Sequence, residues 1–513
     1  FGSAMMTPDA GMAHASRIAT GRGQVWAYLV ILSAVAVAFG GVWTRGVQGD
    51  DLCMGELASK TGYWAAVQHW LENWNGRLFL AMTQVGSYRL PWFSTPLAAP
   101  WFVLHAMIVG AHMAVCCLLF SLLSRAGVAT GASLTAALLF AIHPVAFEPV
   151  LWLAEGYGYV LGNLLTILAV WSYLEYERRN RPVWLVAAAL LALAATLGIE
   201  QHPFVLGALA TVHLLRSRWH PARHPAWLPL VVMVSCAVIF LAIHFGLFAG
   251  TGGRLDRATA GSAHVAATGF VWKLGWSLSL LPDASPYGGL LRVGLAILKE
   301  NASLVAALAL VVLATAWRIA AADSWRNGAR DALPRRQLWL TITGMAIFCA
   351  ALLPFLFTGK YGVASRNLHV ALPGLLIAAS AMLDLVARRC AFHRAFRLIL
   401  APLVAVCLAV SVAIDIGAQG IFAQSWWFHR QLIGTIEADA ESIRSSGALD
   451  VTGIPERPYS AIAQLDNAWA FPCLVRWVVR DHTVHAWNNL MRPENRRDGA
   501  SDSHRIDWRD HRP

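Results

Sequence analysis

Charged side chains are scarce in this chain. Asp, Glu, Lys and Arg together make up 13% of its 513 residues, against about 25% in an average soluble protein, while 57% are apolar. There is no Lys/Arg-rich arm with interleaved aromatic residues, which argues against a nucleic-acid partner. Neither a Walker-type nor a dinucleotide-type glycine motif occurs, so the sequence predicts no nucleotide-binding loop.

The eight cysteines do not form a disulfide framework, because most of them lie in apolar runs. Only Cys53 and Cys473 are predicted to lie outside the membrane, where oxidation is chemically open to them, and we expect both to be free thiols. No His/Cys/Asp/Glu spacing demands a metal. The sequence thus predicts no required cofactor, and a divalent cation that bridges acids and phosphate stays an open alternative.

Long apolar runs are what the chain has in abundance. Runs of about 18 residues or more can cross the hydrocarbon core of a bilayer, and they recur up to residue 417. The sequence predicts an all-α polytopic membrane protein with about 11 spans. We place them at Val25–Trp43, Leu97–Leu123, Ala132–Leu153, Tyr157–Tyr176, Val183–Ile199, Phe204–Leu215, Leu228–Phe248, Ala302–Ala320, Leu338–Phe357, Leu368–Val386 and Leu398–Ile416, with Phe270–Leu281 as an interfacial or re-entrant helix.

Basic residues set the predicted orientation. They cluster in short segments between apolar runs, which the positive-inside rule places in the cytoplasm: Arg178–Arg181, Arg216–Arg223, Arg326–Arg336 and Arg388–Arg397. Residues 1–24 are then a tag remnant and a cytoplasmic N-terminus, and residues 25–417 are the membrane domain. Residues 418–490 form a small extracytoplasmic domain, and residues 491–513 a polar tail that we expect to be disordered.

The first outer loop, residues 46–95, carries the most chemistry. Asp50 and Asp51 are adjacent carboxylates just beyond a membrane helix. An isolated acid pair is usually just solvated, but here an amphipathic segment follows, with Trp64, Val67, Leu71 and Trp74 at helical spacing. Arg77 comes directly after the Asn75-Gly76 helix stop. An acid pair, an interfacial helix and an arginine in one loop suit an amphiphilic phosphate substrate.

Other polar groups fall at the same predicted outer boundary. They are His143, Glu148, Glu155, Tyr157, Tyr159, Glu200, His202, Lys360, Tyr361, Arg366 and His369. Singly, each has an ordinary explanation as a snorkelling cation, an interfacial tyrosine or a helix cap, and for His143, Glu148 and His202 we favour it. Collectively, the gathering of acids and bases on one side predicts a lumenal or periplasmic site.

Several short motifs resemble the GT-C glycosyltransferases, membrane enzymes that use polyprenyl-phosphate-linked sugars. The acidic Gly49-Asp50-Asp51 and the first loop resemble bacterial envelope glucosyltransferase-like proteins. His143-Pro144 through Trp152, Gly198 to Gln201 and Ser365 to Leu368 are similar to segments of TPR-containing O-mannosyltransferases. The resemblance covers roughly residues 25–417. No TPR repeat follows and the tail lacks any assignable motif, so the acceptor is left open.

The resemblance implies an inverting glycosyltransferase in the bacterial inner membrane with a periplasmic active site. Asp50 or Asp51 is the implied base that deprotonates an acceptor hydroxyl on an envelope glycan, lipid or protein. Arg366, with Lys360 and Arg77 second, is the implied binder of donor phosphate. The sugar or acceptor pocket is assigned to Glu155, Tyr157, Glu200, His202, Tyr361 and His369. The alternatives are a polytopic transporter or flippase, against which no internal repeat is found, and a non-catalytic envelope scaffold.

Overall fold

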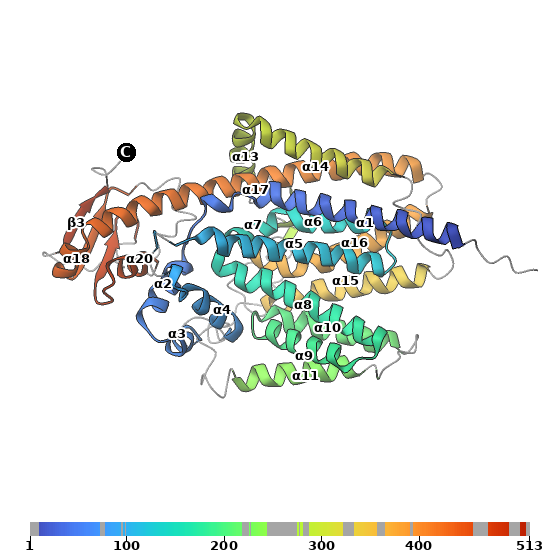
Figure 1. The fold of residues 1–513 in the computed structure, drawn as a ribbon, viewed down its shortest axis with the longest axis horizontal. Helices are drawn as coiled ribbons and strands as arrows, with labels where there is room; N and C mark the ends of the chain where they lie inside the picture. The colour runs from blue at the N-terminus through green and yellow to red at the C-terminus, as the bar shows by residue number, and fades with distance from the viewer. Residues whose placement is uncertain are drawn as a thin grey trace, which may run out of the picture.

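Helices dominate the computed structural model, which describes residues 10–71, 77–93, 96–97, 99–217, 225, 227–243, 274–275, 277–280, 287–321, 333–356, 365–389, 393–454, 470–491 and 503–508. Most of the long helices run side by side along the molecule (Figure 1). The longer ones are α1 (Ala10–Phe39), α5 (Trp101–Arg125), α6 (Thr130–Ile142), α8 (Leu153–Arg179), α9 (Pro182–Thr196), α10 (Gln201–Ser217), α11 (Leu228–Leu241), α13 (Gly288–Glu300), α14 (Ala302–Ala320), α15 (Leu333–Leu356), α16 (Ser365–Arg389) and α17 (His393–Ala438).

The prediction of a polytopic helical membrane protein is confirmed. In the described part, seven helices are long and apolar enough to span a membrane, or eight if one bent pair counts as a span. Val25–Trp43, for example, was predicted as the first span, and the corresponding helical stretch covers Gly23–Thr44. The predicted spans at 183–199, 204–215 and 228–248 correspond to helices α9, α10 and α11, which have 15, 17 and 14 described residues against about 20 in a typical crossing.

The third predicted span is broken. Helix α6 ends at Ile142, and a short turn η4 (Pro144–Ala146) leads into α7 (Phe147–Leu151) at an angle of 46°. Pro144 cannot donate a helical hydrogen bond, and the Val145 amide donates instead to His143 Nδ1 at 3.2 Å. This break turns Glu148 toward the neighbouring helices.

Helices α13 and α17 cross at very close range. A Cβ atom at Gly294 would lie 1.7 Å from the Ala413 carbonyl oxygen, and one at Gly417 would lie 1.9 Å from that of Leu290. Only glycine allows the two backbones to approach so closely. Half of the predicted interfacial helix at Phe270–Leu281, just before α13, lies outside the described residues, and Leu274, Gly275, Ser277 and Leu278 in the described half are helical.

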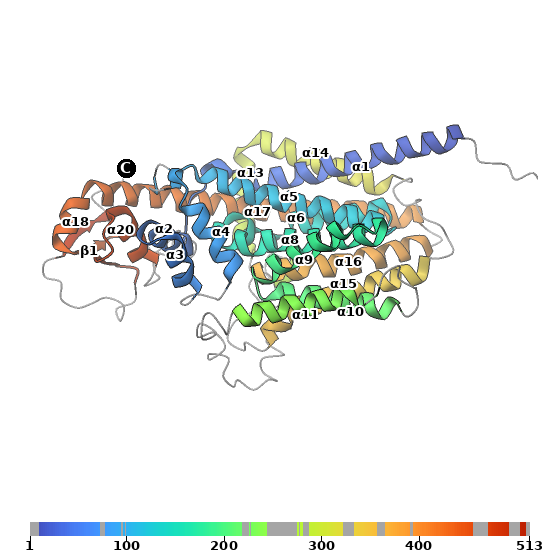
Figure 2. The same ribbon diagram turned by 60° about the horizontal axis from the view of Figure 1, so that its bottom comes forward.

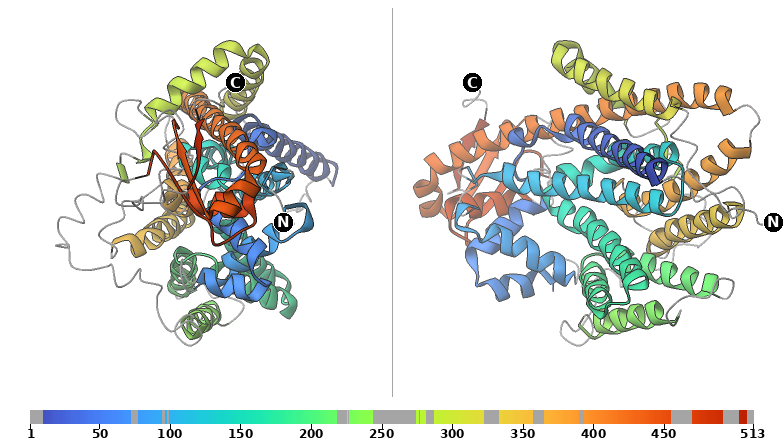
Figure 3. Two further views of the ribbon diagram at one scale, coloured as in Figure 1. Left: turned by 90° about the vertical axis from the view of Figure 1, so that its left-hand side faces the viewer. Right: turned by 45° about the vertical axis from the view of Figure 1, so that its right-hand side comes forward.

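The segments outside the bundle gather at one end of it (Figures 1 and 2). After η1 (Val42–Thr44), the first loop folds into α2 (Asp50–Lys60), α3 (Tyr63–Trp70), α4 (Leu78–Tyr88) and η3 (Pro91–Phe93). Beside them lies a C-terminal unit, seen end-on in Figure 3, made of α18 (Ala440–Ser446), β1 (Ala448–Thr452), α20 (Ala470–Val479), β2 (His485–Asn488) and β3 (His504–Asp507).

The C-terminal unit differs from the prediction in three ways. Its three strands form a parallel sheet in the order β2-β1-β3, so the chain is not wholly α-helical. Strand β3 lies in residues 491–513, where we expected disorder, because it pairs with β1 from Leu449↔His504 to Thr452↔Asp507. Helix α17 continues through the expected boundary at residue 417 to Ala438.

The prediction of free thiols at Cys53 and Cys473 is wrong. The two cysteines form a disulfide across 420 residues of sequence, with Cα atoms 4.8 Å apart. The bond joins α2 to α20. Next to it, a Cβ atom at Gly55 would lie 2.3 Å from the Trp477 ring, so the two helices are also closely packed.

Candidate functional site

Asp50 and Asp51 occupy the first turn of α2 rather than an extended loop. The helix can begin here because Gly49, its N-cap, adopts φ 53° and ψ −118°. Residues that carry a Cβ atom strongly disfavour this conformation. Two carboxylates at a helix N-terminus are stabilised by the unpaired backbone amides of that turn. The sequence Gly-Asp-Asp therefore builds the start of α2 and fixes both acids at one place.

Asp51 is the buried member of the pair. Only 1% of it is exposed, and its Oδ2 accepts the Gln48 amide at 3.2 Å. Burial raises the pKa of the Asp51 carboxyl to about 8, although the Tyr88 hydroxyl and the Gln48 amide act to lower it. Burial and the nearby Asp51 charge together raise the pKa of Tyr88. At neutral pH Asp51 is therefore mostly protonated, which suits a positioning residue.

Asp50 is only half-buried. It interacts electrostatically with Glu155 and with Arg366, so its carboxylate faces the other side of the site. Of the two acids that the sequence left undistinguished, Asp50 is the more exposed.

Arg366 is the centre of an ion-pair cluster. Its Nη1 lies 2.9 Å from Glu148 Oε1 and 2.9 Å from Glu155 Oε1, and its guanidinium stands over the Trp152 ring at 5.8 Å from the centroid. The three elements that meet here are the start of α16, the short α7 behind the Pro144 break, and the start of α8. Both ion pairs use Nη1, and the Arg366 side chain stays 32% exposed.

Arg77 and Glu200, predicted to serve donor and pocket separately, bind each other. Arg77 Nε and Nη2 donate to the two Glu200 carboxylate oxygens at 2.9 and 2.7 Å. Burial alone would lower the pKa of Arg77, but the Glu200 charge holds it above its usual value. With 8% exposure and a bidentate partner, Arg77 fastens α4 to the start of α10.

Three other predicted pocket residues are buried among the helices. His202 and His369 are both 0% exposed, and Tyr157 is 2% exposed. His202 Nδ1 lies 2.9 Å from the Thr166 hydroxyl, and Asn163 donates to the His369 carbonyl at 3.0 Å. The two histidines join α8 to α10 and to α16. The Tyr157 hydroxyl is within electrostatic range of Asp51 instead.

Lys360 and Tyr361 lie outside the described residues. Within the described ranges, no three His, Cys, Asp or Glu side chains are grouped as metal ligands. Glu148 and Glu155 are two acids that lie close together, and the Arg366 guanidinium binds both of them.

A polar cavity of about 380 Å³ lies next to α2, outside the spans. Tyr88 lines it, so the cavity adjoins the phenol that neighbours Asp51. Its polar lining is basic, with Arg89, Arg480 and His482, and Arg480 adopts the left-handed φ of 56°. The lining residue His482 also contacts α2, since its Nδ1 lies 3.2 Å from Glu56 Oε1.

Sequence reasoning set Glu148 aside as an ordinary boundary residue, and it did not anticipate the Tyr88 side chain beside Asp51. A signal for Glu148 was present in the His143-Pro144 break, which redirects the following turn. No comparable local signal exists for Tyr88, because it reaches Asp51 only through the folding of α4 onto α2.

The described helices define a multi-pass membrane protein. No family model matches the chain, and no curated protein matches it in sequence. Among solved structures it is similar to ArnT from Cupriavidus metallidurans bound to undecaprenyl phosphate, at 14% identity and a TM-score of 0.43, with 90% of this chain and 85% of that chain covered.

The chain is also similar to two structures from Archaeoglobus fulgidus. One is an oligosaccharyltransferase in complex with Zn and sulfate (14% identity, TM-score 0.45, 91% of this chain covered). The other is the oligosaccharyltransferase AglB in complex with an inhibitory peptide and a dolichol-phosphate (13% identity, TM-score 0.42, 92% of this chain covered). The chain spans 62% and 65% of their lengths. Identities and TM-scores this low assign neither a family nor an activity.

Proposed function

We propose that the protein is an inverting glycosyltransferase that moves a sugar from a polyprenyl-phosphate donor to a hydroxyl of an envelope glycan, lipid or protein. The observation that carries the proposal is the placement of Asp50. A half-buried carboxylate at a helix N-terminus interacts electrostatically with an arginine whose side chain is 32% exposed, at the end of a membrane bundle. A base and a phosphate-binding cation at that position suit a reaction on a lipid-anchored phosphosugar.

In the proposed reaction, the acceptor oxygen forms a bond to the anomeric carbon while the bond from that carbon to the phosphate oxygen breaks. The acceptor proton passes to Asp50, and polyprenyl phosphate leaves with the electron pair. Attack from the face opposite to the leaving group inverts the configuration. A carboxylate suffices as the base, because the hydroxyl becomes acidic only as the new bond forms.

Arg366 is the proposed contact for the donor phosphate. Its Nη1 holds Glu148 and Glu155, and its Nη2–Nε edge makes no hydrogen bond with the described residues. A planar guanidinium can bind two carboxylates with one edge and phosphate oxygens with the other. Arg77 is a weaker candidate, since its Nε and Nη2 groups already donate to the Glu200 carboxylate. Lys360 stays a candidate from sequence alone.

The basic cavity beside Tyr88 is the proposed approach for an acceptor, because it is lined by Ala58 and Ser59 of α2 and by the tyrosine that neighbours Asp51. We place the site on the periplasmic face of a bacterial inner membrane. The positive-inside rule supports this orientation, since Arg125, Arg178, Arg179, Arg216 and Arg336 all lie near the helix ends remote from α2.

The test uses the purified full chain with a panel of polyprenyl-phosphate-linked hexoses that carry a radiolabel in the sugar. Release of free polyprenyl phosphate needs no identified acceptor, because water can take the acceptor's place. Asp50→Asn should lower release by at least about 100-fold, as loss of a general base does. Glu441→Gln, an exposed acid on α18, is the matched control and should leave release unchanged.

Two results would contradict the proposal. The first is wild-type turnover in Asp50→Asn protein that is correctly folded. The second is movement of labelled lipid across a vesicle bilayer with the phosphosugar bond intact, which would instead support the flippase alternative.

A further inference from the structure

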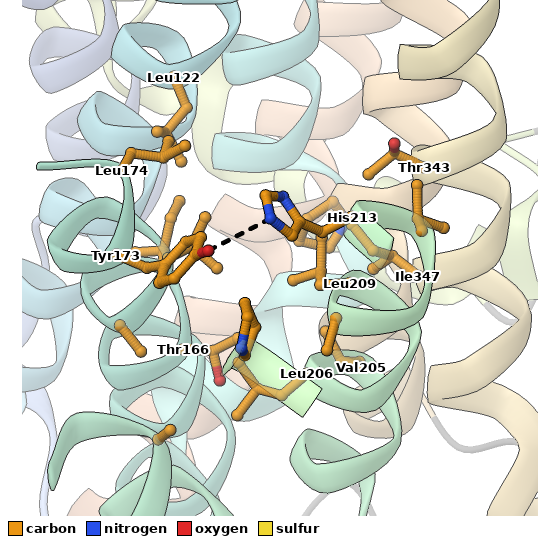
Figure 4. Close-up of a pocket in the computed structure, with 18 of the residues that line it drawn as sticks. Leu122, Thr166, Tyr173, Leu174, Val205, Leu206, Leu209, His213, Thr343 and Ile347 are labelled. Carbon is orange, nitrogen blue, oxygen red and sulfur yellow. Dashed lines mark hydrogen bonds between the residues drawn. The ribbon is translucent and has the colours of Figure 1, made fainter. Parts of the chain in front are cut away.

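A second cavity lies inside the bundle, remote from Asp50. It measures about 360 Å³, within the range of small-molecule sites, and its walls come from α5, α8, α9, α10, α11, α15 and α16 (Figure 4). Leu122 and Tyr173 line it near the C-terminal ends of α5 and α8, whereas Asp50 and Arg366 lie by the N-terminal end of α8. The cavity therefore extends to the end of the bundle opposite to Asp50, while its other end includes Val370, four residues after Arg366.

Polarity rises along the cavity in one direction. On α10 the lining residues run from Leu206 and Leu209 to His213 and then Arg216, at helical spacing on one face. His213 Nε2 lies 3.2 Å from the Tyr173 hydroxyl, as the dashed line in Figure 4 shows. The order of hydrocarbon, neutral hydrogen-bonding pair and guanidinium matches the order of chain, ester and phosphate in a phospholipid.

The charged end of the cavity carries an excess of positive charge. Among the described residues no carboxylate pairs with Arg216, and a second guanidinium, Arg336, is close enough for the two charges to interact. Arg336 itself is held in place by a hydrogen bond from Nη2 to the Arg125 carbonyl at 3.0 Å. Two acids lie near this end, and both are bonded: Glu177 accepts the Tyr173 hydroxyl at 2.8 Å, and Glu175 pairs with Arg125, Arg178 and Arg179. The two close guanidinium groups of Arg216 and Arg336 therefore favour an anionic ligand.

The cavity is open on its lipid side and closed toward the proposed active site. Leu174 lines it and is 47% exposed, so a chain can enter sideways from the bilayer. At the other end, Asn163 and Thr166 also line it, and they are bonded to the buried His369 and His202.

We propose that this cavity is a binding site for an anionic phospholipid of the surrounding bilayer. One acyl chain lies between α8 and α10, the glycerol esters lie at the depth of Tyr173 and His213, and the phosphate contacts Arg216. This site is distinct from the donor site, and the inference does not depend on the proposed glycosyltransferase activity.

The test is native mass spectrometry of the full chain after detergent removal of lipid and titration with phosphatidylglycerol or phosphatidylcholine. Wild type should bind one phosphatidylglycerol in preference to phosphatidylcholine. Arg216→Gln should weaken phosphatidylglycerol binding roughly tenfold, as the loss of one charge-assisted contact predicts. Leu209→Trp should fill the chain site and abolish binding of that one lipid.

The matched controls are Arg181→Gln, an exposed arginine at the same end of the bundle, and Leu310→Trp, on an exposed face of α14. Both should bind like wild type. Equal affinity for the two phospholipids would overturn the proposal, as would equal losses in the control variants. Displacement of the bound phosphatidylglycerol by stoichiometric polyprenyl phosphate would also overturn it, because the cavity would then be a donor-chain site.

Discussion

Cys53 in α2 is disulfide-bonded to Cys473 in α20. Cys53 is three residues after Asp50, and Cys473 belongs to the helix that packs over Gly55 through Trp477. The bond therefore fixes the helix that carries both candidate catalytic acids to a unit formed more than 400 residues later in the chain. A disulfide that closes so long a loop restricts the unfolded chain strongly.

Removal of this disulfide should destabilise the protein. Cys53→Ser is expected to lower the unfolding free energy by roughly 2–4 kcal/mol, and reductant should do the same to wild type. Thermal unfolding in detergent, with and without dithiothreitol, measures this. Cys349→Ser removes an exposed free thiol and is the matched control. Equal melting temperatures for all samples would show that the bond carries no stability.

Asp51 should make stability depend on pH. Its pKa of about 8 lies far above the usual value, so between about pH 4 and pH 8 the folded protein binds a proton more tightly than the unfolded chain does. The stabilisation is complete below about pH 4 and is lost as pH rises through 8. The melting temperature of wild type should therefore fall from pH 5 to pH 8 relative to that of Asp51→Asn, which mimics the protonated carboxyl. Parallel curves for the two proteins would contradict a raised pKa for the buried Asp51 carboxyl. Glu441→Gln, which removes an exposed acid, is the control and should follow the wild-type curve.

Donor use should be sensitive even to the conservative substitution Arg366→Lys. A snorkelling cation needs only a long charged chain, so Arg366→Lys would then be nearly silent. A residue that bridges two carboxylates and a phosphate needs the planar fork, and Arg366→Lys should raise the donor KM while folding is retained. Arg366→Ala should lose more, roughly 2–4 kcal/mol of transition-state stabilisation by analogy with an oxyanion donor.

Donor-dependent turnover and thermal stability should be measured together for the Arg366 variants. Arg125→Lys is the matched comparison, because Arg125 pairs with the buried Glu175 at the end of the bundle remote from α2. It should change turnover only as far as it changes stability. If Arg366 variants behave in the same way, Arg366 is an anchor for α16 and not a substrate contact.

Single cysteines test the orientation of the bundle. With the free cysteines replaced by serine, Ser59→Cys on α2 should react with a membrane-impermeant maleimide in intact cells. Arg181→Cys, between α8 and α9, should react only after permeabilisation. Both positions are exposed in the structure, so access to the reagent depends on the side of the membrane. The reverse labelling pattern would place the acid pair in the cytoplasm and remove the basis for a lipid-linked donor.

The longest apolar helices could be located from the sequence, because a long run of apolar residues is enough to predict a membrane-spanning helix. The predicted span at Leu97–Leu123 overlaps α5 at Trp101–Arg125, for instance. Rotation about the helix axis is another matter. Nearly uniformly apolar helices have no polar face that would reveal which side meets its neighbours. His202 and His369 were therefore assigned to a pocket, although they face adjoining helices.

The predicted acid pair and arginine were found at one end of the bundle, but their partners could not be foreseen. Glu148 and Arg366 are separated by 218 residues, and the disulfide by 420. Such contacts depend on how helices pack, and one chain without aligned relatives carries no local record of packing. The Gly49 turn and the Pro144 break act within a few residues, but we predicted a loop at Asp50 and one uninterrupted span across Pro144.

Helix α17 sets how far the protein reaches from the membrane. Its 46 residues form one rod of about 69 Å, roughly twice the thickness of the hydrocarbon core. A flexible linker would let the C-terminal sheet sample many heights, whereas a continuous helix holds it at one. The continuous helix and the Cys53–Cys473 bond therefore hold the C-terminal unit at one place beside α2 by two independent connections.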